Sequence, residues 1–152
     1  MDTRTRMPML TRCACLVPAA ALLVALASTP ISASQPSAAE LKARAEGRAL
    51  YVEHCASCHG PAARGNGPAA DSLRRLPTNL TGFSQANGGV FPSQRLRQVI
   101  DGRGIGSHGS VEMPVWGSVF KATAGNEQGA RARIEAILTF LQSIQERVGE
   151  DR

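Results

Sequence analysis

The apolar residues of this chain recur mostly at spacings of three and four positions, which is the period of an α-helix. The clearest case is an apolar stripe near the C-terminus, formed by Ile134, Ile137, Leu138, Leu141 and Ile144. Charged and amide side chains fall mostly on the other face of the same stretch, namely Arg131, Arg133, Glu135, Gln142 and Gln145. This pattern predicts an amphipathic helix whose apolar face packs into a core.

A second helix is predicted over residues 40–55, where Gly47, Leu50, Tyr51 and His54 lie along one side. A glycine inside a helix is unfavourable by about 1 kcal/mol relative to alanine. Its presence at position 47 therefore indicates that another helix approaches closely at this point.

The middle of the chain alternates loops and short helices. Residues 60–68 are rich in glycine and proline, which predicts turns. A short helix around residues 71–75 follows, and Ser93 is predicted to cap a helix that runs through Ile100 and ends at Gly102. No stretch alternates as a sheet strand does, and no internal repeat is present. The predicted fold class is all-α, with one domain.

Residues 1–33 are interpreted as a secretory signal peptide. Three arginines precede an apolar run over residues 13–27, which is shorter than the roughly 20 residues that span a membrane. Small residues near Ala33 then offer a cleavage site. An uncleaved N-terminal anchor remains the alternative. We expect residues 34–39 to be a linker, residues 40–148 to form the domain and residues 149–152 to be a tail.

Composition and charge exclude some classes of protein. Only 4% of the residues are aromatic, so large core side chains are scarce. Removal of three arginines and Asp2 with the signal peptide reduces 17 basic and 12 acidic side chains to 14 and 11, a formal charge of +3. The sequence has no basic patch with interleaved aromatic residues, the pattern that would indicate nucleic-acid binding.

The main chemical motif is Cys55-Ala56-Ser57-Cys58-His59. Cys-x-x-Cys-His is the attachment signature of a c-type haem, in which two thiols bond the porphyrin and the imidazole reaches the iron. A thiol redox site would need a βαβ context, which the glycine-rich sequence after His59 does not offer. A zinc site would need a second pair of ligands, and none remains once Cys13 and Cys15 leave with the signal peptide. We therefore predict one covalently attached haem c, which agrees with export to the periplasm.

His59 is then the proximal iron ligand, and its second ring nitrogen needs a hydrogen-bond acceptor that fixes the tautomer. The backbone carbonyl of Pro68 is our candidate acceptor. Met113 is the one methionine after the signal peptide, and it stands in an irregular loop before Pro114, which favours extended backbone at Met113. We predict that Met113 is the sixth ligand. A bis-histidine haem that uses His108 remains open on spacing alone.

A resemblance can be named on these motifs. The chain is similar to the class I, monohaem cytochrome c family of bacteria over roughly residues 47–144. The similarity rests on Gly47-x-x-Leu50-Tyr51, Cys55-x-x-Cys58-His59, Gly65-Asn66-Gly67-Pro68, Leu76-Pro77-Thr78-Asn79-Leu80-Thr81 and Met113-Pro114-Val115-Trp116-Gly117. It implies a small helical fold in which the first and last helices cross, with haem wrapped by loops and Phe140 packed near Gly47 and Tyr51. Arg103 and Trp116 are the expected neighbours of the haem propionates.

The expected function is transfer of single electrons, because imidazole and thioether ligands together leave no open position on the iron. The expected partners are redox proteins: a quinol-linked or dehydrogenase donor, and an oxidase or reductase acceptor. No catalysis, small-molecule substrate or nucleic acid is expected, and membrane contact would come only through partners or an uncleaved signal. Two alternatives remain: a fixed haem c subunit of a dehydrogenase, oxidase or reductase complex, and a haem enzyme or gas sensor.

Overall fold

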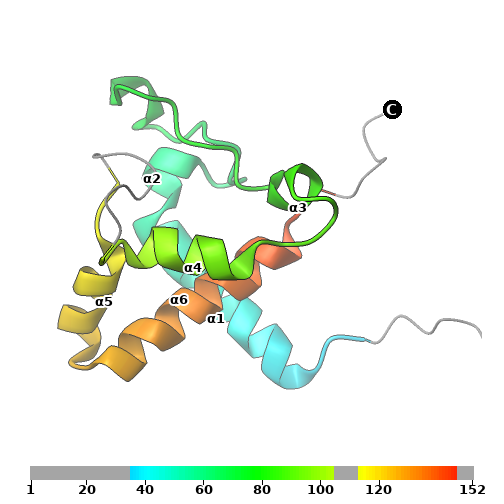
Figure 1. The fold of residues 1–152 in the computed structure, drawn as a ribbon, viewed down its shortest axis with the longest axis vertical. Coiled ribbons are helices and arrows are strands. Elements are labelled where there is room, and N and C mark those ends of the chain that lie inside the picture. Colours follow the sequence, from blue (N-terminus) through cyan, green and yellow to red (C-terminus); the bar gives the residue numbers. More distant parts are fainter. Residues whose placement is uncertain (1–34, 105–112, 147–152) are drawn as a thin grey trace, which may run out of the picture. The chain divides into compact units, whose positions relative to one another are not determined.

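The computed structural model describes residues 35–104 and 113–146, which belong to one compact unit. Within these residues the fold consists of helices and loops without strands, so the predicted all-α class is confirmed (Figure 1). The elements in chain order are α1 (Ala38–His54), α2 (Ala56–His59), the 3-10 helix η1 (Ala70–Ser72), α3 (Phe83–Ala86), α4 (Ser93–Asp101), α5 (Trp116–Ala124) and α6 (Glu127–Ser143).

The first and last long helices, α1 and α6, cross in direct contact (Figure 1). At the crossing, a Cβ atom on Gly47 would overlap the carbonyl oxygen of Ala136 and would lie 3.0 Å from Cβ of Phe140. The rings of Tyr51 and Phe140 pack with their centroids 5.2 Å apart. Both the close approach at Gly47 and the position of Phe140 are confirmed.

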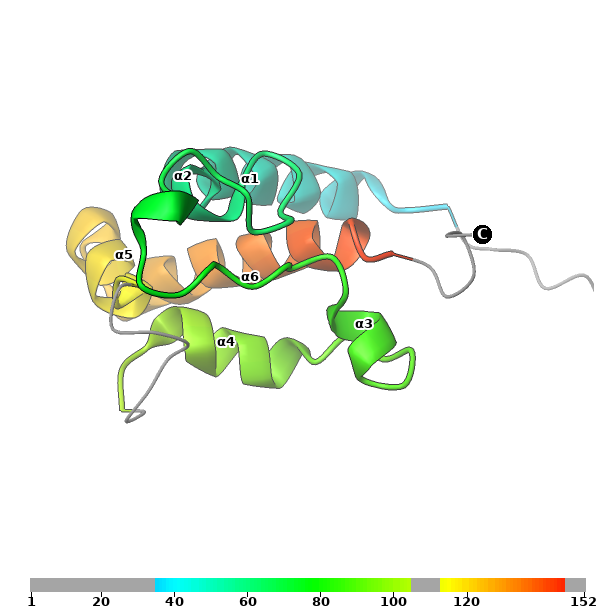
Figure 2. The same cartoon turned by 90° about the horizontal axis from the view of Figure 1, so that it is seen from above.

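Helix α6 lies between α1 and α4, and the N-terminal end of α6 contacts α5 (Figure 2). It therefore supplies most of the core. Its buried residues are Ala130, Ile134, Ala136, Ile137, Leu138, Phe140 and Leu141. The predicted apolar stripe is buried except for Ile144, which is half-buried at the end of the helix.

Helix ends differ in part from the predictions. Gly102 ends α4 in the left-handed conformation as expected, with φ of 70°. Ser93 is the first residue of α4, and Pro92 occupies the cap position, so Ser93 does not act as the cap. The predicted short helix around residues 71–75 is the 3-10 turn η1, which ends at Ser72. Helix α1 begins inside the expected linker, where the Ser37 side chain accepts a hydrogen bond from the Glu40 N–H.

The sequence did not predict α5, which is only nine residues long. Tertiary contacts hold it: Trp116 and Phe120 stack with ring centroids 5.5 Å apart, and both rings contact His54 of α1. No helix of the described segments has the length and apolar character needed to cross a membrane. The predicted signal peptide and C-terminal tail fall outside those segments and remain predictions.

Candidate cofactor site

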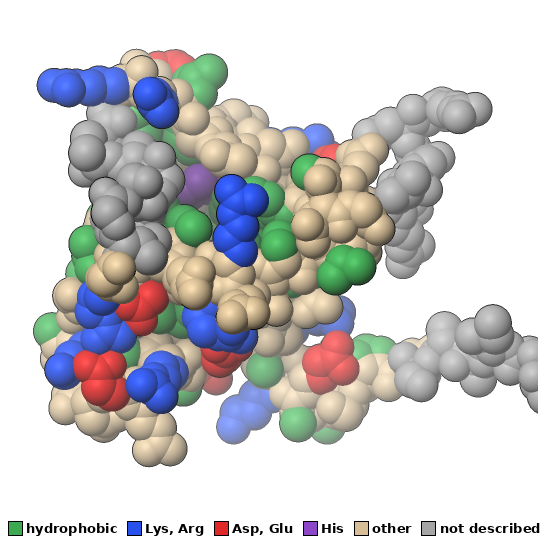
Figure 3. All heavy atoms as spheres, viewed as in Figure 1, with side chains coloured by type: hydrophobic (Ala, Val, Ile, Leu, Met, Phe, Trp, Pro, Cys, Tyr) green, Lys and Arg blue, Asp and Glu red, His purple; other side chains and the backbone are tan. Residues whose placement is uncertain are grey.

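A cavity of about 290 Å³ brings together the motifs that the sequence singled out. This volume is near the lower end of the range for small-molecule sites. Figure 3 shows a hollow above α4 in which hydrophobic and histidine atoms are visible. The apolar residues of the lining include Leu73, Leu76, Pro77, Leu80, Phe83, Leu96, Val99, Ile100, Ile137 and Leu141.

Cys55 and Cys58 lie at the junction of α1 and α2 and both line the cavity. They are free thiols, half-buried, on one turn of backbone in which the Cys58 N–H donates to the Cys55 carbonyl at 3.2 Å. Burial, and then the neighbouring Cys58, raise the pKa of the Cys55 thiol to about 12. Reactive thiolates have lowered pKa values, so Cys55 lacks the character of a thiol redox nucleophile.

His59, the last residue of α2, also lines the cavity. Its Nδ1 lies 3.1 Å from the carbonyl oxygen of Thr78. Because a carbonyl can only accept, Nδ1 carries the proton and Nε2 keeps a free lone pair for a metal. Burial lowers the pKa of His59, which favours the neutral imidazole that metal binding requires.

The acceptor for His59 therefore differs from the predicted Pro68. Residues around Pro68 are held on the backbone of α2 instead, since the Gly67 N–H donates to the Cys58 carbonyl and the Ala69 N–H donates to the Ser57 carbonyl. Pro68 itself is exposed. The segment that follows Pro77 brings the Thr78 carbonyl to the imidazole.

Met113, Pro114 and Trp116 line the same cavity, although Met113 is 54 positions away from His59 in the sequence. Met113 is half-buried and packs against the hydrophobic core. The structure thus brings the two predicted iron ligands to one cavity. His108, the alternative ligand, lies outside the described residues.

The expected role of Arg103 at the propionates is not supported by the structure. Its guanidinium binds Asp101 through Nε at 2.7 Å and Nη2 at 2.8 Å, and binds Glu127 through Nη1 at 2.9 Å. Arg103 does not line the cavity, whereas the exposed Arg75 does. Trp116 lines the cavity, and its indole packs against His54 at 5.1 Å between ring centroids. Its expected place beside a haem propionate stays a prediction.

Sequence reasoning missed three contributors to this site. His54 was placed only along one side of the first helix, yet it lines the cavity and contacts the rings of both Trp116 and Phe120. Nothing in the sequence except its positive charge pointed to a place for Arg75 at this site. The Thr78 carbonyl could not be found from side chains at all, because any residue offers a backbone oxygen.

The donor set fits haem c and does not fit a bare metal site. Apolar walls suit the porphyrin faces, two free thiols suit covalent attachment, and an imidazole nitrogen and a thioether sulfur suit iron. Over residues 35–104 and 113–146, no group of three or more His, Cys, Asp or Glu side chains could hold a metal ion by itself.

Comparison with known proteins supports the same conclusion. Residues 42–132, more than half of the chain, match the family described as cytochrome C oxidase, cbb3-type, subunit III. No curated protein and no solved structure matched the chain. A c-type cytochrome domain implies covalently bound haem c. With its crossing helices and its Cys-x-x-Cys-His motif facing an apolar cavity, the chain belongs to the cytochrome c oxidase, cbb3-type, subunit III family.

Proposed function

We propose that this chain is an exported electron-transfer protein that carries one haem c. In this proposal Cys55 and Cys58 would hold the haem covalently, and His59 and Met113 would bind its iron, as the resemblance to class I cytochromes c implies. The haem supplies reversible one-electron exchange between ferrous and ferric iron. The protein residues would attach it, bind its iron and cover its faces with apolar side chains.

One observation carries the proposal: a single apolar cavity is lined by both cysteines, by His59 and by Met113. The hydrogen bond from His59 Nδ1 to the Thr78 carbonyl leaves Nε2 free to face a metal. With both His59 and Met113 bound to it, the iron would have no open position for a substrate or gas. The protein then moves electrons without transforming a substrate, and a methionine sulfur raises the reduction potential.

The setting is also a proposal. The basic and apolar N-terminal segment supports export to the periplasm, and the expected partners are a quinol-linked or dehydrogenase donor and an oxidase or reductase acceptor. The family match favours a second candidate, a fixed haem c subunit of an oxidase complex. Co-purification with a larger haem-containing partner would favour the subunit, and a monodisperse monomer would favour the free carrier.

Absorption spectroscopy of the exported holoprotein tests the ligand set. Pyridine haemochrome analysis should give one covalently bound haem per chain. The ferric spectrum should show the weak far-red band of methionine sulfur on iron, and Met113→Ala should abolish it. Rapid carbon monoxide binding to the reduced wild-type protein, or an unchanged spectrum in Met113→Ala, would refute the carrier and favour a haem enzyme or gas sensor.

A further inference from the structure

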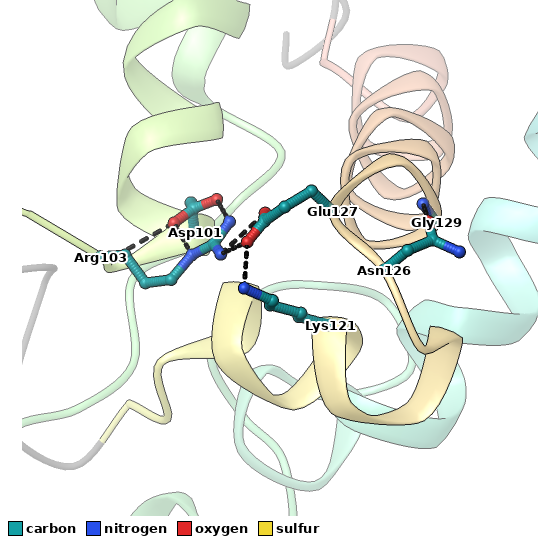
Figure 4. Close-up of polar contacts among 6 residues, drawn as sticks. All are labelled: Asp101, Arg103, Lys121, Asn126, Glu127 and Gly129. Atoms are coloured by element: carbon teal, nitrogen blue, oxygen red, sulfur yellow. Dashed lines mark hydrogen bonds and ion pairs between the residues drawn. The ribbon is translucent and has the colours of Figure 1, made fainter.

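Four charged side chains form an ion-pair cluster at the meeting point of three helices, comprising Asp101, Arg103, Lys121 and Glu127 (Figure 4). Arg103 binds both oxygens of Asp101 at 2.7 and 2.8 Å and both oxygens of Glu127 at 2.9 Å. Lys121 Nζ lies 2.8 Å from Glu127 Oε1. The cluster therefore links the end of α4, the last turn of α5 and the start of α6.

The first turn of α5 packs directly on this cluster. A Cβ atom on Gly117 would lie 2.6 Å from Arg103 Nε and 2.6 Å from Asp101 Oδ1, which is closer than real side chains approach. Gly117 is buried. The glycine thus provides the space in which the Arg103–Asp101 pair lies against the backbone of α5.

This contact joins the two ends of the segment that carries Met113. Arg103 comes ten positions before Met113, and Gly117 comes four positions after it. We propose that the Arg103–Asp101 pair, anchored by Glu127 and seated on Gly117, positions Met113 for the iron by fixing both ends of its segment. The inference rests on the proposed function, because it assumes that Met113 is the sixth ligand.

Two features separate this cluster from ordinary surface ion pairs. The side chains of Arg103 and Asp101 are only 31% and 23% exposed, and Arg103 uses its planar guanidinium to hold two carboxylates at once. Groups that orient the ligands of a metal alter affinity at the metal even though they do not touch it. Loss of the cluster should therefore weaken the methionine–iron bond more than it weakens the fold.

The test compares Arg103→Gln with Arg97→Gln in the holoprotein. Arg97 offers a matched control, because it also binds a carboxylate with two nitrogens, in an ion pair formed by α4 and Glu135 of α6 alone. Both changes remove one positive charge. Imidazole titration of the ferric protein measures how easily an external ligand replaces the methionine, and the far-red band reports the bond directly.

Arg103→Gln should bind imidazole about tenfold more tightly than wild type, equivalent to about 1.4 kcal/mol, and should lose far-red intensity. Arg97→Gln should leave both readouts unchanged. Arg103→Lys keeps the charge but loses the two-nitrogen geometry, so it should fall between wild type and Arg103→Gln. Gly117→Ala displaces the Arg103–Asp101 pair and should behave like Arg103→Gln. It replaces Arg103→Gln in the test if that variant does not accumulate as folded protein.

The outcomes distinguish this inference from the proposed function. A wild-type protein without the far-red band would refute methionine ligation itself. A wild-type protein with the band overturns the positioning role if Arg103→Gln and Gly117→Ala leave imidazole affinity unchanged. Equal shifts in Arg97→Gln and Arg103→Gln would also overturn it, because charge or general stability would then explain the effect.

Discussion

The crossing of α1 and α6 allows a quantitative prediction of how the substitution Gly47→Ala changes stability. In an isolated helix, Gly47→Ala would be stabilising by about 1 kcal/mol, because alanine has the higher helix propensity. In this fold the added methyl group would overlap the carbonyl oxygen of Ala136 and press on Phe140. A backbone oxygen cannot rotate away, so the two helices must separate.

The magnitude follows from these opposing effects. Overpacking a close contact removes about 1–3 kcal/mol of stability, and a clash with backbone belongs at the upper end of that range. Subtracting the propensity gain leaves a net loss of about 2 kcal/mol. With a urea dependence of about 2 kcal/mol per molar, the unfolding midpoint should fall by about 1 M.

Urea unfolding of the holoprotein, followed by far-ultraviolet circular dichroism, measures this shift. Ala49→Gly is the matched control, because Ala49 is exposed on the same helix. That change should destabilise the protein by about 1 kcal/mol through propensity alone. An unchanged or raised midpoint in Gly47→Ala would refute the reasoning, since it would show that the crossing tolerates a side chain.

Two further predictions concern polar contacts. Tyr51→Phe removes the buried hydrogen bond from the Tyr51 hydroxyl to the Gly60 carbonyl at 2.6 Å; it should lower the free energy of unfolding by about 1 kcal/mol without changing the haem spectrum, and urea unfolding checks this. The hydrogen bonds from Arg103 hold the pKa of Asp101 below its usual value of 3.8. The stability from this ionised carboxylate is complete above the unfolded pKa and is lost as pH falls through the folded pKa. Asp101→Asn should therefore lose less stability between about pH 5 and pH 2 than wild type does, as measured by thermal unfolding across that range; an equal loss would contradict the role of the pair.

The helices show where sequence reasoning succeeds. The stripe of α6 and the glycine of α1 were predicted because long amphipathic helices carry a periodic signal that does not depend on their neighbours. Helix α5 was not predicted. Its nine residues are held by the rings of His54, Trp116 and Phe120, which come from two helices far apart in the chain.

The candidate site divides in the same way. Cys55, Cys58 and His59 were identified by a short motif, because its spacing places two thiols and an imidazole on one turn. Met113 was identified as the one methionine that follows the predicted signal peptide. Their role in binding haem stays a prediction. What the structure adds is that all four residues line one cavity.

The sequence by itself determined which reactive and metal-ligating groups lie together, because residue identity and short spacing suffice to place two thiols and an imidazole on one turn. Only the tertiary structure decided the partners of these groups. The Thr78 carbonyl, and not that of Pro68, accepts the hydrogen bond from His59, and Arg103 binds Asp101 and Glu127 away from the cavity. Backbone oxygens and surface arginines look alike in a sequence, so their roles depend on which segments the fold brings within hydrogen-bond distance.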